Sequence, residues 1–321
     1  MPRKVLITVS PVYRRAVDRL VLRLESEGLE VNYLNRPDEQ LAATELRELL
    51  EGASICIVGN ARVPRAVLEA LPDLKLICKF GAGVDNIDLA AAAERGVAVT
   101  NAAGGNAIAV AEMTIGLMLA LRRALKQLDR GLREDQWRTT PGQELHGATL
   151  GIVGLGNIGK LVAIRARAFG MRVLSNDIVE YPAFCRKHQV EAVGLEALLA
   201  AASIVTLHVP LTPQTRYLIG EAQLRRMPPD SMLIHTARGG VVDEAALDRL
   251  LREGHLAGAA VDVFEQEPLG PSPLRDLENV ILTPHVAGIT YQAAQRIADR
   301  TLENVLAFLA GQPLPNRLHA V

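Results

Sequence analysis

Short apolar runs of strand length alternate with amphipathic helical patterns along almost the whole chain. A first block carries such runs at 4–10, 29–34, 53–59, 74–81 and 96–101, and a second block extends from TLGIVG at residue 149 to NVILTPH at residue 285. This alternation is typical of parallel strands that are covered by helices on both faces. Two blocks in 321 residues therefore predict an α/β protein with two doubly wound domains.

A long helical pattern, AIAVAEMTIGLMLALRRALKQL at 107–128, lies between the two blocks and is apolar around most of its surface. Such a helix is normally buried against other elements or against a second subunit. We therefore expect the region 107–128 to form the partner surface of a homodimer. Other helices are expected at 13–27 and at 291–310.

Composition and charge argue against several kinds of partner. The net charge is −1 and the basic residues are scattered, so no binding of nucleic acid is expected. No uncharged apolar run reaches about 18 residues, so no membrane span is expected. The N-terminal residues do not resemble a signal peptide, and Cys56, Cys78 and Cys185 form no CxxC pair. These features predict a cytoplasmic protein without disulfides and without a metal site.

The segment TLGIVGLGNIGK carries Gly154, Gly156 and Gly159 in the pattern GxGxxG, between an apolar run and a helical pattern. There the first glycine permits a tight turn, the second lets the backbone approach a diphosphate, and the third lets helix and strand pack closely. Asp177 ends the next apolar run, where its carboxylate can bind the adenosine ribose and repel a 2′-phosphate, and no basic residue follows until Arg186. NAD is therefore predicted over NADP. A glycine-rich turn without a ligand is the disfavoured alternative.

Three later strand ends carry polar residues: Arg238 in HTARGG, Glu267 in DVFEQEP and His285 in LTPHVAG. Taken alone, each has an ordinary explanation as a surface ion pair, a solvated turn residue or a hydrogen-bonded loop histidine. Ligands of open α/β sheets bind outside the carboxyl ends of the strands, so we expect these side chains to lie at one ligand site. Histidine exchanges a proton near neutral pH, a neighbouring carboxylate favours its charged form, and arginine binds carboxylates in a forked geometry.

Seven motifs follow one another along nearly the whole chain: KFGAGVDNID, NAIAVAE, GIVGLGNIG, HVPLTPQTRYLI, TARGGVVDE, DVFEQEP and TPHVAG. This set resembles the D-isomer-specific 2-hydroxyacid dehydrogenases. The resemblance implies a flavodoxin-like, substrate-binding domain formed by 1–100 and 288–321, and an NAD-binding Rossmann domain formed by 101–287. It also implies that the chain interconverts a small D-2-hydroxy acid and its 2-keto acid by hydride transfer.

The resemblance assigns roles to individual positions. Arg238, Glu267 and His285 correspond to the catalytic set, with His285 as general acid and base, Glu267 as its partner, and Arg238 on the substrate carboxylate and carbonyl. Substrate binding is implied for Ala82, Gly83, Val84 and Arg238. Cofactor binding is implied for Gly154, Gly156, Asn157, Ile158, Gly159, Asp177, His208, Val209, Pro210, Thr236, Ala237, Asp262 and Gly288.

One position departs from the phosphoglycerate dehydrogenases of this family. An arginine that helps to bind their phosphorylated substrate corresponds to Val58 or Gly59, and Arg62, Arg65 and Lys79 are the available substitutes. The sequence therefore leaves open a 3-phosphoglycerate dehydrogenase and a glyoxylate or hydroxypyruvate reductase.

Other departures bear on the alternatives that share this scaffold. Ala82 occupies the place of a loop lysine of phosphite-type dehydrogenases, which disfavours that reaction. An NADH-sensing, corepressor-like binding module is a further alternative, disfavoured because no extended basic or proline-rich stretch is present. His235 stands where the family commonly has an asparagine, and we expect it to alter the hydrogen bonds around Arg238.

Overall fold

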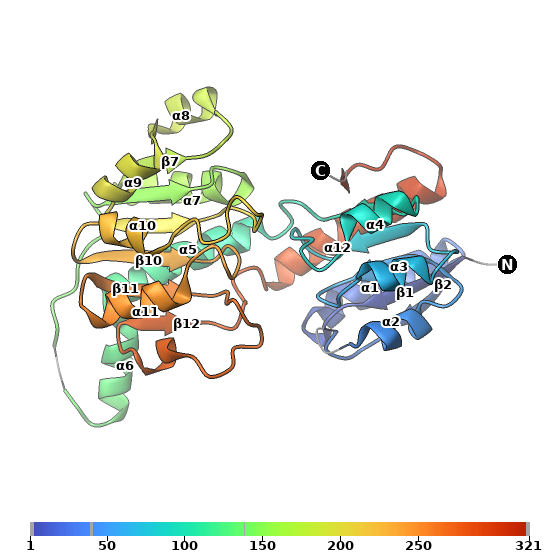
Figure 1. Cartoon of the computed structure of the whole chain (residues 1–321), viewed down its shortest axis with the longest axis horizontal. Coiled ribbons are helices and arrows are strands. Elements are labelled where there is room, and N and C mark those ends of the chain that lie inside the picture. Colours follow the sequence, from blue (N-terminus) through green and yellow to red (C-terminus); the bar gives the residue numbers. More distant parts are fainter. Residues whose placement is uncertain (1–2, 39–40, 138, 319–321) are drawn as a thin grey trace. The chain divides into compact units, whose positions relative to one another are not determined.

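The computed structural model describes residues 3–38, 41–137 and 139–318. The chain forms two compact units: unit 1 comprises Met1–Asn106 and Ile289–Val321, and unit 2 comprises Ala107–Gly288. Each unit contains its own parallel sheet between helices (Figure 1). The predicted α/β class with two doubly wound domains is confirmed. No helix within the described ranges is long and apolar enough to cross a membrane.

The sheet of unit 1 has the strand order β13-β5-β4-β3-β1-β2, and only β13 pairs in the antiparallel sense. Its strands are β1 Lys4–Thr8, β2 Glu30–Tyr33, β3 Ala53–Val58, β4 Leu76–Lys79, β5 Ala98–Thr100 and β13 Arg317–Leu318. Its helices are α1 Arg14–Ser26, α2 Ala43–Leu49, α3 Arg65–Glu69, α4 Leu89–Glu94 and α12 Tyr291–Leu309, with a short 3-10 helix at Pro11–Tyr13.

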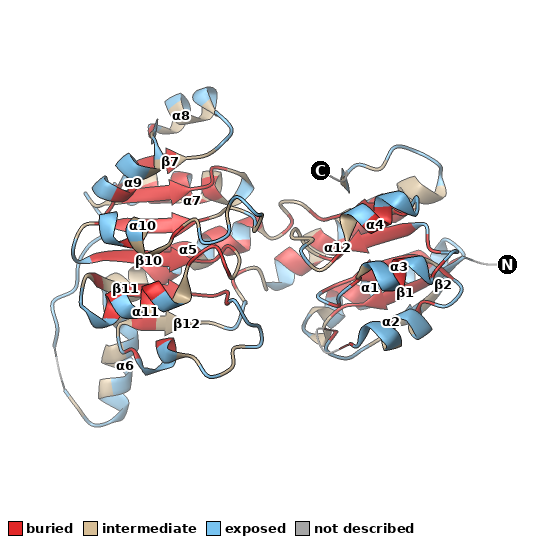
Figure 2. Ribbon diagram, viewed as in Figure 1, coloured by how far each residue is buried: buried red, intermediate tan, exposed pale blue. Residues whose placement is uncertain are grey.

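Alternate side chains of these strands enter two different cores, as the two-residue period of a strand requires. Val5 and Ile7 of β1 pack with α1 and α12 on one face. Leu6 packs with α2, α3 and α4 on the other face. The central strands β1, β3 and β4 are consequently almost fully buried, whereas the edge strand β2 and the outer surfaces of the helices are exposed (Figure 2).

Unit 2 has a seven-stranded sheet of order β12-β11-β10-β9-β6-β7-β8, and all its pairs are parallel. The strands are β6 Thr149–Val153, β7 Arg172–Asn176, β8 Val190–Ala192, β9 Ile204–Leu207, β10 Ser231–His235, β11 Leu256–Val261 and β12 Val280–Leu282. The helices are α5 Ala107–Arg122, α6 Leu125–Arg133, α7 Asn157–Ala168, α8 Pro182–His188, α9 Leu195–Ala201, α10 Glu221–Arg226 and α11 Glu244–Arg252, with a 3-10 helix at Pro273–Asp276.

The strand order of unit 2 creates a switch point between β6 and β9. From β6 the chain adds β7 and β8 on one side, and it then returns to add β9 to β12 on the other. Helices α5 and α7 pack on one face of the sheet, and α9, α10 and α11 pack on the other. Connections therefore diverge at the carboxyl ends of β6 and β9, which is where open α/β sheets bind their ligands.

The single helix predicted at 107–128 is wrong, because the chain breaks it into α5 and α6. Ala124 has a left-handed backbone (φ 50°) between the two helices. The carbonyl of Arg122, which a continuing helix would use, accepts instead from the N–H of Gln143 at 2.8 Å. Lys126 Nζ then donates to the carbonyl of Val280 at 2.8 Å. Contacts with distant parts of the chain thus stabilise the break, and the local sequence does not reveal them.

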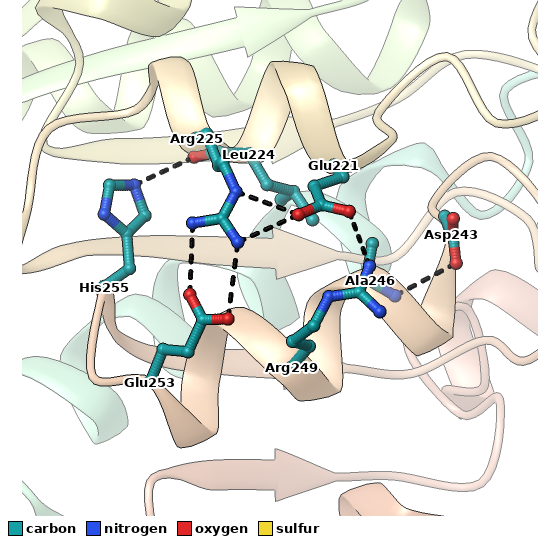
Figure 3. A network of polar contacts seen from close by, with 8 residues as sticks. All are labelled: Glu221, Leu224, Arg225, Asp243, Ala246, Arg249, Glu253 and His255. Carbon is teal, nitrogen blue, oxygen red and sulfur yellow. Dashed lines mark hydrogen bonds and ion pairs between the residues drawn. The ribbon is translucent and has the colours of Figure 1, made fainter.

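Ion pairs join α10 and α11 on the surface of unit 2 (Figure 3). Arg225 pairs with Glu221 at 2.9 Å and with Glu253 at 3.1 Å, and Arg249 pairs with Glu221 at 2.6 Å. An isolated exposed ion pair contributes little to stability, whereas linked pairs hold their elements more firmly. The network therefore fixes α11 against its neighbour.

Candidate active site

The three polar residues predicted at strand ends lie at the carboxyl edge of the sheet in unit 2. Arg238 follows β10, Glu267 lies in the loop after β11, and His285 follows β12. His285 Nδ1 and Glu267 Oε2 are 2.7 Å apart, and both side chains are partly exposed. The structure thus brings His285 and Glu267 into direct contact although 18 residues separate them in sequence.

The carboxylate of Glu267 is held at both oxygens. Oε1 accepts a hydrogen bond from the N–H of Phe264 at 3.0 Å, while Oε2 faces His285. Burial alone raises the pKa of Glu267, but the hydrogen bond and charge of His285, the Phe264 N–H and the charge of Arg238 outweigh burial and lower it. An ionised carboxylate only accepts hydrogen bonds, so Nδ1 of His285 must carry the proton. Nε2 of the neutral ring is then left as a base.

Asp262 shapes the turn that presents His285. Its buried carboxylate accepts from the hydroxyl of Thr283 at 2.6 Å, from the N–H of Val286 at 2.9 Å and from the N–H of Ala287 at 3.0 Å. Its carbonyl accepts from the N–H of His285 at 2.8 Å. His285 has a left-handed backbone (φ 52°), which is uncommon outside glycine. The bonds to Asp262 offset the cost of that conformation.

Arg238 is held close to the Glu267 loop by the residue that follows it. Gly239 packs so tightly that a side-chain carbon there would overlap the carbonyl of Phe264, and only glycine fits. Arg238 Nη1 donates to the carbonyl of Ala237 at 2.8 Å. Its charge is near enough to lower the pKa of Glu267. Arg238, Glu267 and His285 therefore form one electrostatic cluster.

The glycine-rich turn between β6 and α7 is closely packed at two of its glycines and open at the third. Gly154 has a positive φ of 99°, and an added Cβ would lie 2.6 Å from the carbonyl oxygen of His208. At Gly159 an added Cβ would overlap the carbonyl of Gly154, whereas at Gly156 it would meet nothing within 4 Å. Gly156 is the N-cap of α7 and has no side chain to bind the N–H groups of the first turn, where Asn157 and Ile158 lie. The space beside Gly156 is therefore suited to an anion, which the N–H groups at the N-terminus of α7 would bind.

Asp177 is oriented across the same turn. Its Oδ2 accepts from the N–H of Leu155 at 2.5 Å and its Oδ1 from the N–H of Val179 at 2.8 Å. Ile178, directly after it, is fully exposed, and Val179 is half exposed. Sequence reasoning missed this exposed apolar pair, although two apolar residues just beyond the acidic residue were the available signal. Apolar groups in that position suit a flat aromatic ring such as adenine.

Two histidines lie on adjacent strand ends: His208, partly buried, follows β9, and His235, fully buried, ends β10. Burial and the nearby His235 lower the pKa of His208 to about 3. Burial also lowers the pKa of His235 to about 4, against the smaller opposing effects of the Arg238 backbone and the Glu267 charge. His208 Nε2 is 3.1 Å from the hydroxyl of Thr206. Both rings are therefore neutral at neutral pH, unlike an exposed acid–base histidine.

The remaining residues of the predicted cofactor set also belong to unit 2. Val209 and Pro210 continue the loop after β9, and Gly288 closes the unit. Thr236 and Ala237 are buried after β10, with the hydroxyl of Thr236 at 3.4 Å from that of Thr114. Among the described residues, no group of three or more His, Cys, Asp or Glu side chains is placed to hold a metal ion.

The predicted substrate loop belongs to unit 1, where Ala82, Gly83 and Val84 follow β4 and are partly exposed. The amide of Asn101 donates to the carbonyl of Ala82 at 2.7 Å. The amide of Asn86 donates to the carbonyl of Ala61 at 2.6 Å. Asn101 therefore anchors the start of this loop, and Asn86 joins its end to the segment after β3.

The three cations that could replace a phosphate-binding arginine differ in their surroundings. Lys79 is buried and its ammonium donates to the carbonyl of Gly59. Arg65 forms two bonds with Glu94, at 2.5 and 3.0 Å. Arg62 is exposed. Two of the three cations are thus already engaged within unit 1.

Comparison with known proteins identifies the family. The family description "D-isomer specific 2-hydroxyacid dehydrogenase, NAD binding domain" matches residues 115–287. The chain is 44% identical over 257 residues to the glyoxylate reductase of Korarchaeum cryptofilum (strain OPF8), a match that covers 78% of this chain and 77% of that protein. It is 41% identical over 285 residues to the D-3-phosphoglycerate dehydrogenase of Methanocaldococcus jannaschii, covering 86% of this chain but 53% of that protein. The chain thus spans about half the length of the second relative.

A solved structure extends the similarity to the whole fold. The crystal structure of D-lactate dehydrogenase from Aquifex aeolicus, complexed with NAD and lactic acid, gives a TM-score of 0.87 at 30% identity. The match covers 99% of this chain and 99% of that chain. The chain therefore belongs to the D-isomer specific 2-hydroxyacid dehydrogenase family of nicotinamide-dependent oxidoreductases.

Proposed function

We propose that this chain interconverts a small D-2-hydroxy acid and its 2-keto acid, with His285 as general acid and base. The observation that carries the proposal is the 2.7 Å contact between His285 Nδ1 and Glu267 Oε2 at the carboxyl edge of a parallel sheet. Arg238 lies within electrostatic range of the same carboxylate. A base, its orienting carboxylate and a fixed cation are the groups that this chemistry needs.

Each residue has a definite task in this reaction. Nε2 of His285 takes the hydroxyl proton during oxidation and returns it to the oxygen during reduction. Glu267 keeps the proton on Nδ1 and stabilises the imidazolium that forms. Arg238 binds the substrate carboxylate and draws charge toward the carbonyl oxygen. The nicotinamide cofactor, when bound, accepts or supplies the hydride at C2.

NAD is the cofactor that this site favours. The turn of Gly154, Gly156 and Gly159 would hold the diphosphate, with the first-turn N–H groups of α7 directed at it. The Asp177 carboxylate, anchored by the N–H of Leu155, would accept bonds from the ribose hydroxyls. A 2′-phosphate in that place meets a like charge, which costs several kcal/mol.

The substrate we favour is a small, unphosphorylated 2-keto acid of the glyoxylate and hydroxypyruvate type. Backbone N–H groups of Ala82, Gly83 and Val84 would bind its carboxylate. Lys79 is buried on the carbonyl of Gly59 and Arg65 is paired with Glu94, which disfavours both as phosphate ligands, while Arg62 is the exposed cation of the three. The alternative within the family is 3-phosphohydroxypyruvate.

Oxidation of NADH and of NADPH, followed by absorbance, tests this proposal over glyoxylate, hydroxypyruvate, pyruvate and 3-phosphohydroxypyruvate. We expect the highest kcat/KM with NADH and an unphosphorylated acid. A strong preference for the phosphorylated acid would overturn the substrate assignment. Tight NADH binding without turnover of any of these acids would overturn the enzymatic proposal and favour the binding-module alternative.

We also propose a homodimer through the region of α5 and α6. Helix α5 is buried on one side and carries the partly exposed Ile108, while Leu125, Leu132 and Trp137 are exposed in or just after α6. Trp137 is 86% exposed, which is unusual for so large an apolar side chain. Covering these side chains with a second copy would remove them from water.

The three thiols support a location in a reducing compartment. Cys56, Cys78 and Cys185 are all free, and the first two are buried. Disulfides are rare in the cytosol because thiols there are kept reduced. We therefore propose that the protein is cytoplasmic, and fractionation of the source cells would test this assignment.

A further inference from the structure

Glu265 lies two residues before Glu267, and its carboxylate joins two neighbouring loops of unit 2. Oε2 accepts a hydrogen bond from the hydroxyl of Tyr217 at 2.8 Å, in the loop that follows β9. Oε1 accepts from the backbone N–H of Glu244, the first residue of α11, at 3.4 Å. In return, the N–H of Glu265 donates to Glu244 Oε1 at 2.6 Å. Glu244 and Glu265 thus hold each other through a reciprocal pair of bonds.

The backbones of the same loops also meet. The N–H of Tyr217 donates to the carbonyl of Gly240 at 2.7 Å. Gly239 packs directly against the peptide that joins Phe264 to the next residue. The N–H of Phe264 in turn binds Oε1 of Glu267. A continuous set of contacts therefore leads from the loop after β9 to the carboxylate that faces His285.

Helix α11 holds Glu244 in a fixed position. The side chain of Asp243 accepts from the N–H of Ala246 at 3.0 Å and so caps the helix, as Figure 3 shows. Arg249 and Glu253 form ion pairs with α10 further along the helix (Figure 3). The position of Glu244, at the start of α11, is therefore set by a helix that is held at both ends.

Glu244 is also close enough to Glu267 for the charge of Glu267 to raise its pKa. Burial raises the pKa of Glu244, the N–H of Glu265 opposes this, and the charges of Glu265 and Glu267 raise it further. The three carboxylates thus lie in one region. Their mutual repulsion would separate the loops, unless the reciprocal bonds between Glu244 and Glu265 opposed it.

We propose that Glu244 and Glu265 are positioning residues for the His285–Glu267 pair. Their reciprocal bonds hold the loop after β11 so that the Glu267 carboxylate faces Nδ1 of His285. This inference rests on the proposed function of that pair. A displacement of about 1 Å in such a site costs about 100-fold in rate, so we expect Glu265→Ala to lower kcat by about 10- to 100-fold with little change in the KM for NADH.

A spectroscopic test does not depend on turnover. The ring ¹⁵N chemical shifts of His285, assigned with the help of His285→Asn and recorded on the neutral ring, report which nitrogen carries the proton. We expect the Nδ1–H form in the wild-type protein. Glu265→Ala and Glu244→Ala should both shift it toward the Nε2–H form that we expect in Glu267→Ala. Glu244→Gln, which keeps an acceptor oxygen, should restore the wild-type form. The matched control is Glu191→Ala, at an exposed glutamate of β8 that makes none of these contacts.

The outcomes separate the two proposals. The wild-type tautomer in folded Glu265→Ala and Glu244→Ala would overturn the positioning role and leave the pair intact. An Nε2–H form in the wild-type protein would instead overturn the pair itself. If Glu265→Ala does not fold, Glu265→Gln replaces it, with a smaller expected shift. In turnover, adding Glu265→Ala to Glu267→Ala should cause little further loss, because both act through one contact, and additive losses would contradict the proposal.

Discussion

At the scale of single residues, His285 combines its proposed chemistry with a left-handed backbone (φ 52°). Asparagine adopts that conformation more readily than most residues, so His285→Asn removes the imidazole and preserves the turn. We expect turnover to fall by about 10²- to 10⁴-fold, with NADH affinity and thermal stability close to wild type. Steady-state kinetics and NADH fluorescence titration check this, and turnover within a few-fold of wild type would rule out the role.

Glu267 should make the folded protein sensitive to acid. Burial raises its pKa, but His285, the Phe264 N–H and Arg238 together lower it in the folded state. An unfolded glutamate has a pKa of about 4.3, so the stabilisation is complete above that pH and is lost as the pH falls through the lower, folded value. The difference in Tm between wild type and Glu267→Gln should therefore shrink from pH 5 to pH 3. Circular dichroism melts measure it, and a difference that grows over that range would contradict this assignment.

At the scale of elements, the turn between β6 and α7 offers a matched pair of substitutions. Gly159→Ala would overlap the carbonyl of Gly154, and such overpacking costs about 1–3 kcal/mol of unfolding free energy. Gly156→Ala meets no protein atom within 4 Å and has a φ of −74°, so its unfolding free energy should stay within about 1 kcal/mol of wild type.

NADH binding distinguishes the two substitutions further. Gly156→Ala places a methyl group where the diphosphate would approach the backbone, so its Kd for NADH should rise about tenfold or more. Denaturant unfolding and NADH titration of both variants give the comparison. Tight NADH binding by Gly156→Ala would show that the cofactor does not approach this turn.

The sequence predicted most elements because each apolar run has to be buried on two faces of a sheet. The ends of the runs were less predictable: the run at 74–81 contains β4 only at Leu76–Lys79, since Gly81 already has a φ of 150°. The short strand β8 was missed because only Val190 of its three residues is buried, and the antiparallel β13 was missed because it has two residues. The break at Ala124 depends on Gln143, far along the chain.

For the candidate site, the sequence predicted the main residues but not the contacts that hold them in place. The order of the motifs predicted Arg238, Glu267 and His285 as the catalytic set. The structure places the last two in hydrogen-bond contact. The carboxylate of Asp262 binds the turn around His285, a contact that no spacing rule reveals. The bonds between Glu244 and Glu265 were likewise invisible, because they join two loops that only the fold brings together.

At the scale of the whole molecule, the exposed apolar side chains of α6 and its neighbours predict the assembly. Leu132→Glu should convert the proposed homodimer to a monomer, because a charge would be buried at the interface. Leu22→Glu, at a similarly exposed position on α1 in unit 1, is the matched control and should leave the dimer unchanged. Light scattering coupled to gel filtration gives the mass, and a monomeric wild-type protein would contradict the proposal.

The central claim is that His285 and Glu267 serve the stereospecific reduction of a 2-keto acid with NADH. The most direct measurement is the reduction of hydroxypyruvate with NADH deuterated at the transferable position, followed by chiral analysis and mass spectrometry of the glycerate. We expect D-glycerate with one deuterium at C2 from the wild-type protein, and almost none from His285→Asn. L-glycerate, product without deuterium, or equal product from both proteins would contradict it.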